Sequence, residues 1–379
     1  MEKFGYKILK KDKKTRARRG IIHTSHGDIQ TPAFSPVATK ATVKSLDPTD
    51  LEKTNSQVVL ANTYHLYLRP GMKIIDEFKG FAPFMKWDGP TITDSGGYQV
   101  SFLMGQKPKI TDEGALFRSY LDGSKIFLTP EGSMEIQKSL NADIIMAFDQ
   151  PLGSSYSDKK KKEAFIRTLK WEERSFIHFQ KIKSKQALFG IVQGDLDKDL
   201  RRQSLKFILD TGFPGIAMGG ESIGSNSKLT AQTLDTIVDL IPDDKPVHAL
   251  GLGGGPEGIF EAVEKAVDIF DNTSITRMAR TGLLFVYPED NGSSDSKFRI
   301  DIKKSKFKDI KAPISKICEC YACQNFSSAY IHHLIISKEI LGSRLGTIHN
   351  VTFINKLMSQ IRDAIENADF SDLKMNWLS

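Results

Sequence analysis

The sequence is poor in cysteine and has no long apolar run. Its 379 residues include three cysteines, all within the stretch ICECYACQNF, at positions 318, 320 and 323. So few thiols at one place do not make a disulfide framework, and this favours a reducing compartment. No apolar run approaches the roughly 20 residues that span a bilayer, and the first residues, MEKFGYKILKKDKK, lack the apolar core of a signal peptide. We therefore expect a cytoplasmic protein with no membrane segment.

The charge balance is basic, and the excess is uneven. Hydrophobic residues make up 40% and charged residues 26%, as in ordinary globular proteins, with 53 Lys and Arg against 46 Asp and Glu. Much of the excess lies in KKDKKTRARR near the start, DKKKKE at 158–163 and KKSKFKDIK at 303–311. Each cluster alone is compatible with solvated surface lysines. Together they favour a polyanionic partner, of which nucleic acid is the commonest.

Short apolar runs that end in small or polar residues recur along the chain. Eight such runs lie at 31–39, 56–63, 90–97, 143–150, 187–194, 215–220, 247–254 and 267–272. Between them are longer stretches with helical periodicity, such as EGSMEIQKSL and KKEAFIRTLKWEERSFIHFQKI. Unbroken apolar strands that alternate with helices indicate a parallel sheet covered on both faces. Eight units in this length predict an α/β fold, a (β/α)8 TIM barrel, with a doubly wound open sheet as the alternative.

Polar and small residues stand where the predicted strands end. In a barrel these carboxyl ends converge on one mouth, where active sites are built from several strands, and this arrangement favours the barrel over the open sheet. The residues at these positions are Asn62, Asp94, Asp149, Gln193, Gly219, Gly220, Gly251 and Asp271.

The composition changes after Arg280. YPEDNGSSDSKFR, at 287–299, has the composition of an exposed loop, and the third basic cluster and the cysteines follow it. Two helical patterns, at about 327–341 and 350–367, close the chain. We expect a catalytic barrel with an N-terminal extension at 1–290 and a subdomain at 291–379.

The three cysteines form a C-x-C-x2-C knuckle, which is typical of a zinc site that needs one more ligand. Downstream candidates are His332 and His333, inside the first helical pattern, and His349, in TIHNV, where the second helix is expected to begin. Three thiolates and one histidine leave no open position, so such a zinc is structural rather than catalytic. The alternative is three free thiols packed in a small core.

Two aspartates at strand ends suggest glycosidic chemistry. Asp94, in DSGGYQ, and Asp271, in FDNTSITRMAR, supply the carboxylate pair that retaining enzymes use: one attacks the anomeric carbon and the other handles the proton of the leaving group. The alternative for each aspartate is a helix N-cap. The loop GLGGGPEG, at 251–258, lacks the spacing of a dinucleotide site and is interpreted as a βα loop.

Several long motifs resemble those of one family in both their residues and their order along the chain. They are TPAFSPVATKATVKSLDP, ANTYHLYLRPG, DSGGYQVSF, FRSYLDGSKIFLTPE, IIMAFD, GIVQGD, FDNTSITRMARTG and C-x-C-x2-C-x25-H, and they cover nearly the whole chain. The family is that of the bacterial tRNA-guanine transglycosylases, or queuine tRNA-ribosyltransferases. The resemblance implies a barrel with a zinc-binding subdomain, a homodimer, and His349 as the partner of Cys318, Cys320 and Cys323 on a structural Zn²⁺.

The resemblance also implies the reaction. Members of the family exchange guanine at the wobble position of tRNAs with a GUN anticodon for a 7-deazaguanine base, in most bacteria 7-aminomethyl-7-deazaguanine, a precursor of queuosine. No nucleotide cofactor is needed, because one glycosidic bond replaces another. By similarity, Asp271 is the nucleophile that holds the ribose covalently, and Asp94 is the general acid/base.

The binding residues carry over in the same way. Asp149, Gln193 and the Gly220 amide would bind the edge of the base, and Tyr98 would stack on its ring. Two arginines, Arg277 and Arg280, match those that grip the uridine after the target guanosine.

The sequence departs from the family pattern around the base pocket. Pro151 stands in place of a cysteine, Leu250 in place of a methionine that packs on the base, and Asn272 in place of a cysteine beside the nucleophile. In the loop GGESIGS, Glu221 occupies a leucine position and Ser225 a glutamate position. We expect Glu221 to supply the carboxylate for a cationic aminomethyl group, with a loop that binds another 7-substituent as the alternative.

Three alternatives concern substrate and activity. The first is queuine as the incoming base, although Ile223 is not small, which favours the aminomethyl base. The second is a non-catalytic tRNA-binding homologue, against which the retained aspartates argue. The third is an archaeosine-type enzyme, which carries additional carboxy-terminal RNA-binding domains that this sequence does not contain.

Overall fold

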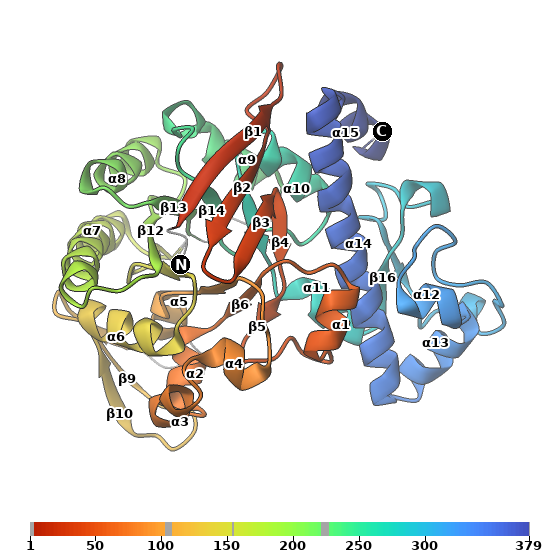
Figure 1. The fold of residues 1–379 in the computed structure, drawn as a ribbon, viewed down its shortest axis with the longest axis horizontal. Helices are drawn as coiled ribbons and strands as arrows, with labels where there is room; N and C mark the ends of the chain where they lie inside the picture. Colours follow the sequence, from red (N-terminus) through yellow and green to blue (C-terminus); the bar gives the residue numbers. More distant parts are fainter. Residues whose placement is uncertain (1–3, 103–107, 154, 221–226, 379) are drawn as a thin grey trace.

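The centre of the molecule is one parallel sheet. The structure, a computed structural model, describes residues 4–102, 108–153, 155–220 and 227–378. The sheet has nine strands, which Figure 1 shows surrounded by helices. In chain order they are β4 (Ala33–Ser35), β5 (Val37–Ala38), β6 (Val59–Ala61), β7 (Thr91–Thr93), β11 (Ile144–Met146), β12 (Ala187–Val192), β13 (Gly215–Met218), β14 (Val247–Ala249) and β15 (Ile269–Asp271).

The sheet closes on itself through Pro36. Strand β4 pairs with β15 at one end of the sheet and β5 pairs with β6 at the other, and Pro36 is the one residue between β4 and β5. Proline has no N–H to donate, which explains the break in the first strand, while its carbonyl still accepts from the Leu60 amide at 3.1 Å. Each of the eight apolar runs contains a barrel strand, and the first contains two. The predicted barrel is confirmed over the open sheet.

The barrel strands are apolar on both faces, which explains their unbroken runs. Along β11, Ile144 and Met146 belong to the cluster inside the barrel, whereas Ile145 belongs to the larger cluster under the helices. Side chains alternate in the same way along β12, where Phe189 and Ile191 point inward. Because both faces are buried, period-2 alternation is absent from the sequence.

A three-stranded antiparallel sheet covers the amino-terminal end of the barrel: β1 (Gly5–Lys11), β2 (Arg18–Thr24) and β3 (Gly27–Thr31), in front of the barrel strands in Figure 1. Ile22 and Ile29 from this sheet complete the cluster inside the barrel. Arg18 is buried and pairs with buried Asp268 at 2.6 Å, just before β15. In the described part of the chain, the interior of the barrel is thus covered at the amino-terminal end, and its cavity opens at the carboxyl ends of the strands.

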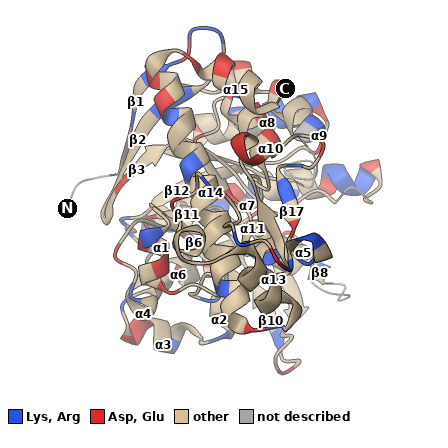
Figure 2. Cartoon of the chain, turned by 90° about the vertical axis from the view of Figure 1, so that its right-hand side faces the viewer, with Lys and Arg blue, Asp and Glu red and all other residues tan. Residues whose placement is uncertain are grey.

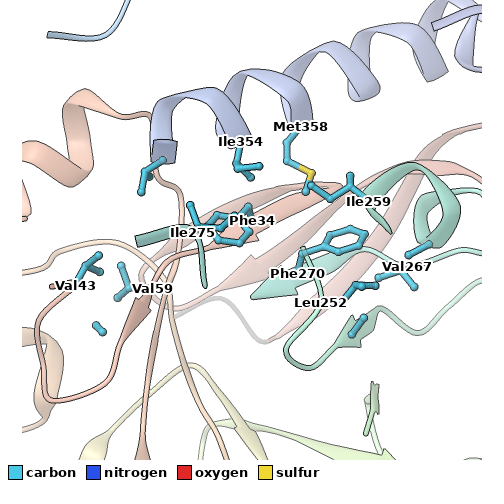
Figure 3. Packing of buried hydrophobic residues seen from close by; sticks show 14 of the residues in the cluster. Phe34, Val43, Val59, Leu252, Ile259, Val267, Phe270, Ile275, Ile354 and Met358 are labelled. Atoms are coloured by element: carbon cyan, nitrogen blue, oxygen red, sulfur yellow. The ribbon is translucent and has the colours of Figure 1, made fainter. Parts of the chain in front are cut away.

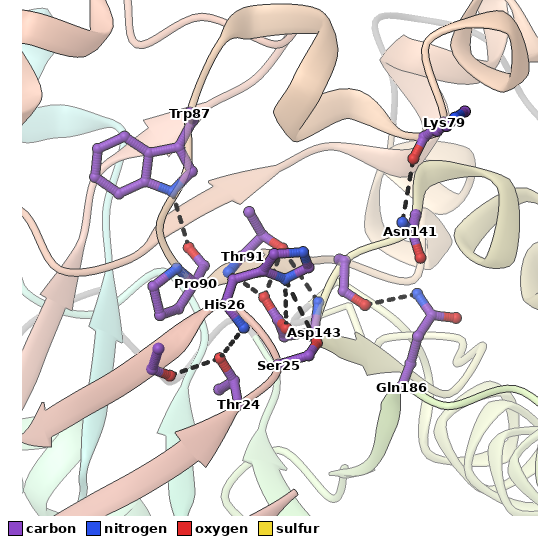
Figure 4. A network of polar contacts seen from close by, with 12 residues as sticks. Thr24, Ser25, His26, Lys79, Trp87, Pro90, Thr91, Asn141, Asp143 and Gln186 are labelled. Atoms are coloured by element: carbon purple, nitrogen blue, oxygen red, sulfur yellow. Dashed lines mark hydrogen bonds and ion pairs between the residues drawn. The ribbon is translucent and has the colours of Figure 1, made fainter. Parts of the chain in front are cut away.

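Asp143 fastens this small sheet to the barrel (Figure 4). Its Oδ1 accepts from the Ser25 hydroxyl at 2.6 Å and lies 2.8 Å from His26 Nδ1. Its Oδ2 accepts from the amide and the hydroxyl of Thr91, at 2.9 and 3.0 Å. Although Ser, His and Asp meet here, the hydroxyl donates to the carboxylate itself rather than to an imidazole. The group is therefore a structural clamp and not an activated nucleophile.

Helices cover the outside of the barrel. Both helical stretches expected from periodicity are present, one as α6 and the other within α7, where Ser157 caps the first turn. The helices are α1 (Pro48–Lys53), α2 (Thr63–Leu68), α3 (Met72–Glu77), α4 (Phe81–Met85), α5 (Gly97–Phe102), α6 (Pro130–Leu140), α7 (Asp158–Lys181), α8 (Lys198–Thr211), α9 (Ser227–Asp235), α10 (Pro256–Val263) and α11 (Ser274–Arg280). A small antiparallel sheet, β8 (Lys109–Ile110), β9 (Ala115–Arg118) and β10 (Lys125–Leu128), precedes α6.

The C-terminal part packs closely on the barrel. It contains β16 (Leu283–Phe285), β17 (Arg299–Asp301), α12 (Tyr321–Asn325), α13 (Ser328–Ile336), α14 (Ile340–Asn367) and α15 (Phe370–Leu378). Figure 3 shows Ile354 and Met358 of α14 above the buried Phe34 and Phe270 of barrel strands. None of the helices in the described ranges is long and apolar enough to cross a membrane. A boundary at residue 290 stays a prediction.

The last long helix begins earlier than expected. We predicted a start near residue 350, but α14 starts at Ile340, so His349 lies inside the helix rather than at its beginning. Gly342 and Gly346 lower the helical tendency of this first part. Both are needed for close packing: a Cβ on Gly346 would lie 3.0 Å from the Ala279 carbonyl oxygen of α11, and one on Gly342 2.9 Å from Leu334 Cβ.

In the view of Figure 2, basic and acidic residues are interspersed along the chain, and basic residues lie on the loop between β1 and β2. Part of the first basic cluster is used inside the chain. Besides the buried Arg18, Lys11 pairs with Asp243, and Arg19 lies 3.3 Å from Glu366. This cluster is therefore partly structural.

Candidate active site and metal site

One large cavity opens at the carboxyl ends of the barrel strands. Its volume is about 980 Å³. The cavity is lined by residues that follow several different strands, as the sequence predicted for a barrel mouth. Those named from the sequence are Asn62, Asp94, Tyr98, Asp149, Gln193, Gly219, Gly220, Leu250, Gly251, Asp271 and Arg277.

Asp94 follows β7 and is half-buried in the wall of the cavity. Its carboxylate accepts from the Thr63 amide at 2.9 Å, from the Asn62 side chain and from Gln99 Nε2 at 3.3 Å. Burial raises the pKa of Asp94 to about 7 against the opposing Thr63 hydrogen bond, and the charges of Asp271 and Asp149 raise it further. A carboxyl group with this pKa can both donate and accept a proton near neutral pH.

Asp149 follows β11 and is almost fully buried. Its Oδ1 accepts from the Ser95 hydroxyl and its Oδ2 from Gln193 Nε2, both at 2.8 Å. Burial raises the pKa of Asp149 to about 6, although both hydrogen bonds favour the ionised form. Near neutral pH the group is mostly an ionised acceptor at the base of the cavity.

Asp271 is the last residue of β15 and is 8% exposed. Its Oδ1 accepts from the Gly251 amide at 3.1 Å and lies 2.9 Å from Nε2 of His248, which is wholly buried. Asn272, one of the departures noted above, donates to the Gly251 carbonyl at 2.6 Å and accepts from the Ser274 amide. It thereby holds the βα loop at 251–258 against the start of α11.

Glycines allow the walls of the cavity to approach one another. A Cβ on Gly97 would lie 2.2 Å from the Asp149 carbonyl oxygen, and a Cβ on Gly219 would lie 2.6 Å from Gln193 Nε2. Gly96 has φ +82° and turns the chain from β7 into α5. The prediction that the glycines after Asp94 permit a tight turn is confirmed.

The other predicted residues lie around the rim. Tyr98, on α5, is 56% exposed, and Leu250 lines the cavity above the barrel interior. Arg277 and Arg280 are one helical turn apart on α11, and Arg277 lines the cavity while Arg280 is half-buried beside it. Burial, and then the charge of Arg277, lower the pKa of Arg280. Two close guanidinium groups form a basic edge beside Asp271.

Some predicted positions cannot be placed. Glu221, Ile223 and Ser225 lie outside the described residues. Pro151, in place of the family cysteine, lines the cavity.

A second group of residues, none of which lines the cavity, could hold a metal ion. The ligand atoms of Cys318, Cys320, Cys323 and His349 are buried and lie within 4.8 Å of one another. His349 Nδ1 is 3.3 Å from the Cys323 sulfur and 3.6 Å from the Cys320 sulfur. Its Nε2 lies 2.7 Å from the carbonyl oxygen of Phe285 and donates to it, which leaves Nδ1 free to bind a metal. Of the three candidate histidines, His349 is the one that the structure brings to the thiols.

Sequence reasoning missed several residues of the site. His248 lies in the middle of an apolar strand, and a buried polar side chain at such a position must find a partner, which is the signal that was available. Ser95 stands inside DSGG, and nothing in the sequence distinguishes it from a turn serine. Lys297 and Arg299, from the segment after the barrel, also line the cavity.

Comparison with known proteins agrees with this geometry. The family model described as Queuine tRNA-ribosyltransferase matches residues 12–379. The queuine tRNA-ribosyltransferase of Psychrobacter cryohalolentis is 46% identical over 358 residues, which cover 94% of this chain and 92% of the relative. Those of Desulforamulus reducens and Staphylococcus haemolyticus are each 44% identical and cover 98% and 97% of this chain, and 97% and 94% of their own lengths. The chain therefore belongs to the queuine tRNA-ribosyltransferase family of pentosyltransferases.

Proposed function

We propose that this enzyme exchanges guanine at the wobble position of GUN-anticodon tRNAs for a 7-deazaguanine base, by double displacement. The observation that carries the proposal is the convergence of Asp94, Asp149 and Asp271, from three different strands, on one cavity. Two of these carboxylates suffice for retaining chemistry at an anomeric carbon, and the third is an acceptor for a purine-like edge.

In the first half-reaction, a carboxylate oxygen of Asp271 attacks C1′ of the target ribose. A bond forms between this oxygen and C1′, the glycosidic bond to guanine breaks, and the Asp94 carboxyl group protonates the departing base. In the second half-reaction, Asp94 accepts the proton of the incoming base, whose nitrogen attacks C1′ and releases the Asp271 carboxylate. Two inversions give retention, and the RNA backbone stays intact.

The base lies in the part of the cavity formed by Asp149 and Gln193. Asp149 accepts hydrogen bonds from the N–H groups of the Watson–Crick edge. Gln193 Nε2 has two hydrogens and gives one of them to Asp149, so the other is available for the carbonyl of the base together with the Gly220 amide. The exposed ring of Tyr98 stacks on the base, as aromatic side chains do on flipped nucleotides.

The tRNA lies against the basic edge on α11. Arg277 is exposed and lines the cavity, and the half-buried Arg280 lies one helical turn away. A planar guanidinium group with its fork of donors suits the edge and phosphate of the uridine that follows the target guanosine.

The metal in the Cys3His site is a structural Zn²⁺. With usual zinc bond lengths, a tetrahedral site separates a sulfur and a nitrogen ligand by about 3.6 Å, close to the distances between His349 Nδ1 and the sulfurs of Cys320 and Cys323. Four protein ligands leave no position for substrate. The metal holds α12 to α14 and takes no part in base exchange.

A homodimer is proposed from the surface beside this site. Tyr321, Phe326 and Tyr330 form an aromatic row with ring centroids 5.7 and 5.4 Å apart. Ile336, at the end of α13, and Ile340, at the start of α14, are also exposed, Ile340 to 82%. A second copy of the chain would cover these side chains, and sedimentation of Ile340→Lys as a monomer, with wild type as a dimer, would test it. Cytoplasmic location stays a prediction.

The incoming base is 7-aminomethyl-7-deazaguanine, with queuine as the alternative. Both share the guanine edge that Asp149 and Gln193 recognise, so the 7-substituent decides between them. The expected carboxylate for the aminomethyl group is that of Glu221. Replacement of this residue by glutamine is therefore expected to weaken use of the aminomethyl base more than use of guanine.

The test is incorporation of radiolabelled guanine into an unmodified GUN-anticodon tRNA, with wild type compared with Asp271→Asn. Each candidate base is added as a competitor, and the stronger competitor identifies the substrate. Incorporation by wild type alone supports the enzyme and its nucleophile. A zinc-loaded wild type that binds the tRNA but incorporates nothing would refute catalysis and support the non-catalytic tRNA-binding homologue.

A further inference from the structure

The two oxygens of the Asp271 carboxylate have different surroundings. Oδ1 lies 2.9 Å from Nε2 of His248 and accepts from the Gly251 amide at 3.1 Å. For Oδ2, the described part of the chain supplies no hydrogen-bond donor, and Asp271 lines the cavity. One oxygen is therefore held by two donors from inside the barrel, while the other is free to meet substrate.

The strand register fixes His248 in this position. His248 pairs with Ile269 in the parallel ladder between β14 and β15. Asp271 is two residues beyond Ile269, on the same face of the strand, so both side chains point into the barrel. The outward neighbours of His248, Val247 and Ala249, belong to the cluster under the helices. The imidazole is wholly buried, which fixes the ring in place.

The hydrogen bond also fixes the position of the proton on the ring. An ionised carboxylate has no hydrogen to donate, so Nε2 of His248 must be the protonated nitrogen. Nδ1 is buried and has no partner within the described ranges. A neutral ring with the hydrogen on Nε2 leaves only a lone pair at Nδ1, which costs less in an apolar place than an unpaired N–H. The ring therefore acts as a fixed hydrogen-bond donor through Nε2.

We propose that His248 is a positioning residue for the nucleophile, an inference that rests on the proposed function. With the Gly251 amide it engages Oδ1 and leaves Oδ2 as the oxygen that bonds to C1′. In the covalent intermediate, Oδ1 is the ester carbonyl oxygen and keeps both donors. When the incoming base attacks, the C1′–Oδ2 bond breaks and its electron pair returns to the carboxylate.

The two donors stabilise a full carboxylate more than a neutral ester, because hydrogen bonds to charged groups are the stronger ones. His248 therefore favours release of the ribose from the enzyme. Loss of this donor is expected to slow the second half-reaction more than the first, so that covalent enzyme–tRNA accumulates. A purely structural role would instead lower tRNA binding and both half-reactions together.

The experiment compares wild type with His248→Leu, which removes the donor, and His248→Gln, which keeps an amide N–H at a similar reach. We expect the leucine variant to lose about 10- to 100-fold in kcat, the range for a hydrogen bond to a charged group. The KM for tRNA should fall together with kcat, because a slower second half-reaction leaves more of the enzyme in the covalent form. The share of enzyme trapped as a covalent tRNA adduct on a denaturing gel should rise. The glutamine variant should recover most of kcat.

A kcat for His248→Leu within about twofold of wild type would overturn the proposal, as would an adduct share that falls in step with kcat. If the leucine variant does not fold, nitrogen-15 NMR of wild type decides: His248 must be protonated at Nε2, and a ring protonated only at Nδ1 would contradict the geometry. A wild type with no base exchange would refute the proposed function itself, whereas an active wild type with an indifferent His248 would refute only this inference.

Discussion

The rate of guanine release in a single turnover should show a narrow bell-shaped pH dependence. In the proposed mechanism, release requires a protonated Asp94 to donate to the leaving base and an ionised Asp149 to accept from it. The pKa of Asp94 is raised to about 7 and that of Asp149 to about 6, in both cases mainly by burial. The rate therefore rises with pH as Asp149 ionises and falls as Asp94 loses its proton, with an optimum near about pH 6.5.

The magnitude follows from the two pKa values. Two pH units above the optimum, roughly 3% of Asp94 carries a proton while Asp149 is fully ionised, so release is slower by roughly 20-fold. The same loss is expected two units below, where roughly 3% of Asp149 is ionised. The assay mixes excess enzyme with tRNA that carries labelled guanine and follows free guanine between about pH 4.5 and 9, the single-turnover regime that isolates the first half-reaction.

A variant tests whether Asp94 causes the fall in release rate at high pH, the alkaline limb of the profile. Gln99 donates to Asp94 Oδ2 at 3.3 Å and so favours the ionised carboxylate. Gln99→Leu is expected to move the alkaline limb to higher pH, because the ionised form of Asp94 loses a hydrogen bond and the pKa of Asp94 therefore rises. A release rate that stays flat from pH 6.5 to 8.5 in wild type would refute Asp94 as the proton donor.

Three further predictions concern packing and metal. Gly97→Ala places a Cβ 2.2 Å from the Asp149 carbonyl oxygen, so we expect loss of base exchange and a decrease of about 1–3 kcal/mol in unfolding free energy by urea titration; wild-type activity would contradict this. Cys323→Ser should lower the zinc content, measured by elemental analysis, below one ion per chain and should lower Tm by several degrees. A site that holds no metal would show neither change. Arg18→Met leaves Asp268 buried without its cation and should cost about 3–5 kcal/mol of stability, with equal urea midpoints as the refuting outcome.

The barrel was predictable because the strand sequences themselves reflect burial on both faces. Strands buried on both faces must be apolar throughout, and all eight runs that fit this description contain barrel strands. The polar residues that follow these runs were predicted to meet for the same reason, and they do line one cavity. The break at Pro36 was not predicted, because proline inside an apolar run does not reveal which neighbour each half of the strand will choose.

Other features depend on contacts between distant segments. The early start of α14 is stabilised by the fit of Gly342 and Gly346 against α13 and α11, which local propensity opposes. His248 is a single polar residue in an apolar strand, and its partner, Asp271, is 23 residues away. No sequence periodicity and no motif connects these two residues. Only the register between β14 and β15 brings them together.

The three carboxylates of the cavity illustrate how one site can keep like charges in different states. Asp149 receives two side-chain hydrogen bonds and stays mostly ionised near neutral pH despite its burial. Asp94 faces the charges of both other aspartates, and its pKa of about 7 lets it hold a proton until a base leaves. Asp271 has one oxygen fixed by a strand histidine and a loop amide. In the proposed mechanism, the charges of its neighbours thus separate the acid, Asp94, from the acceptor, Asp149, although both buried carboxyl groups accept hydrogen bonds. It follows that Asp149→Asn should do more than weaken base binding: it removes one of the charges that raise the pKa of Asp94, so the alkaline limb of guanine release should move to lower pH. An unchanged limb in that variant would show that the charge of Asp149 does not contribute to the pKa of Asp94.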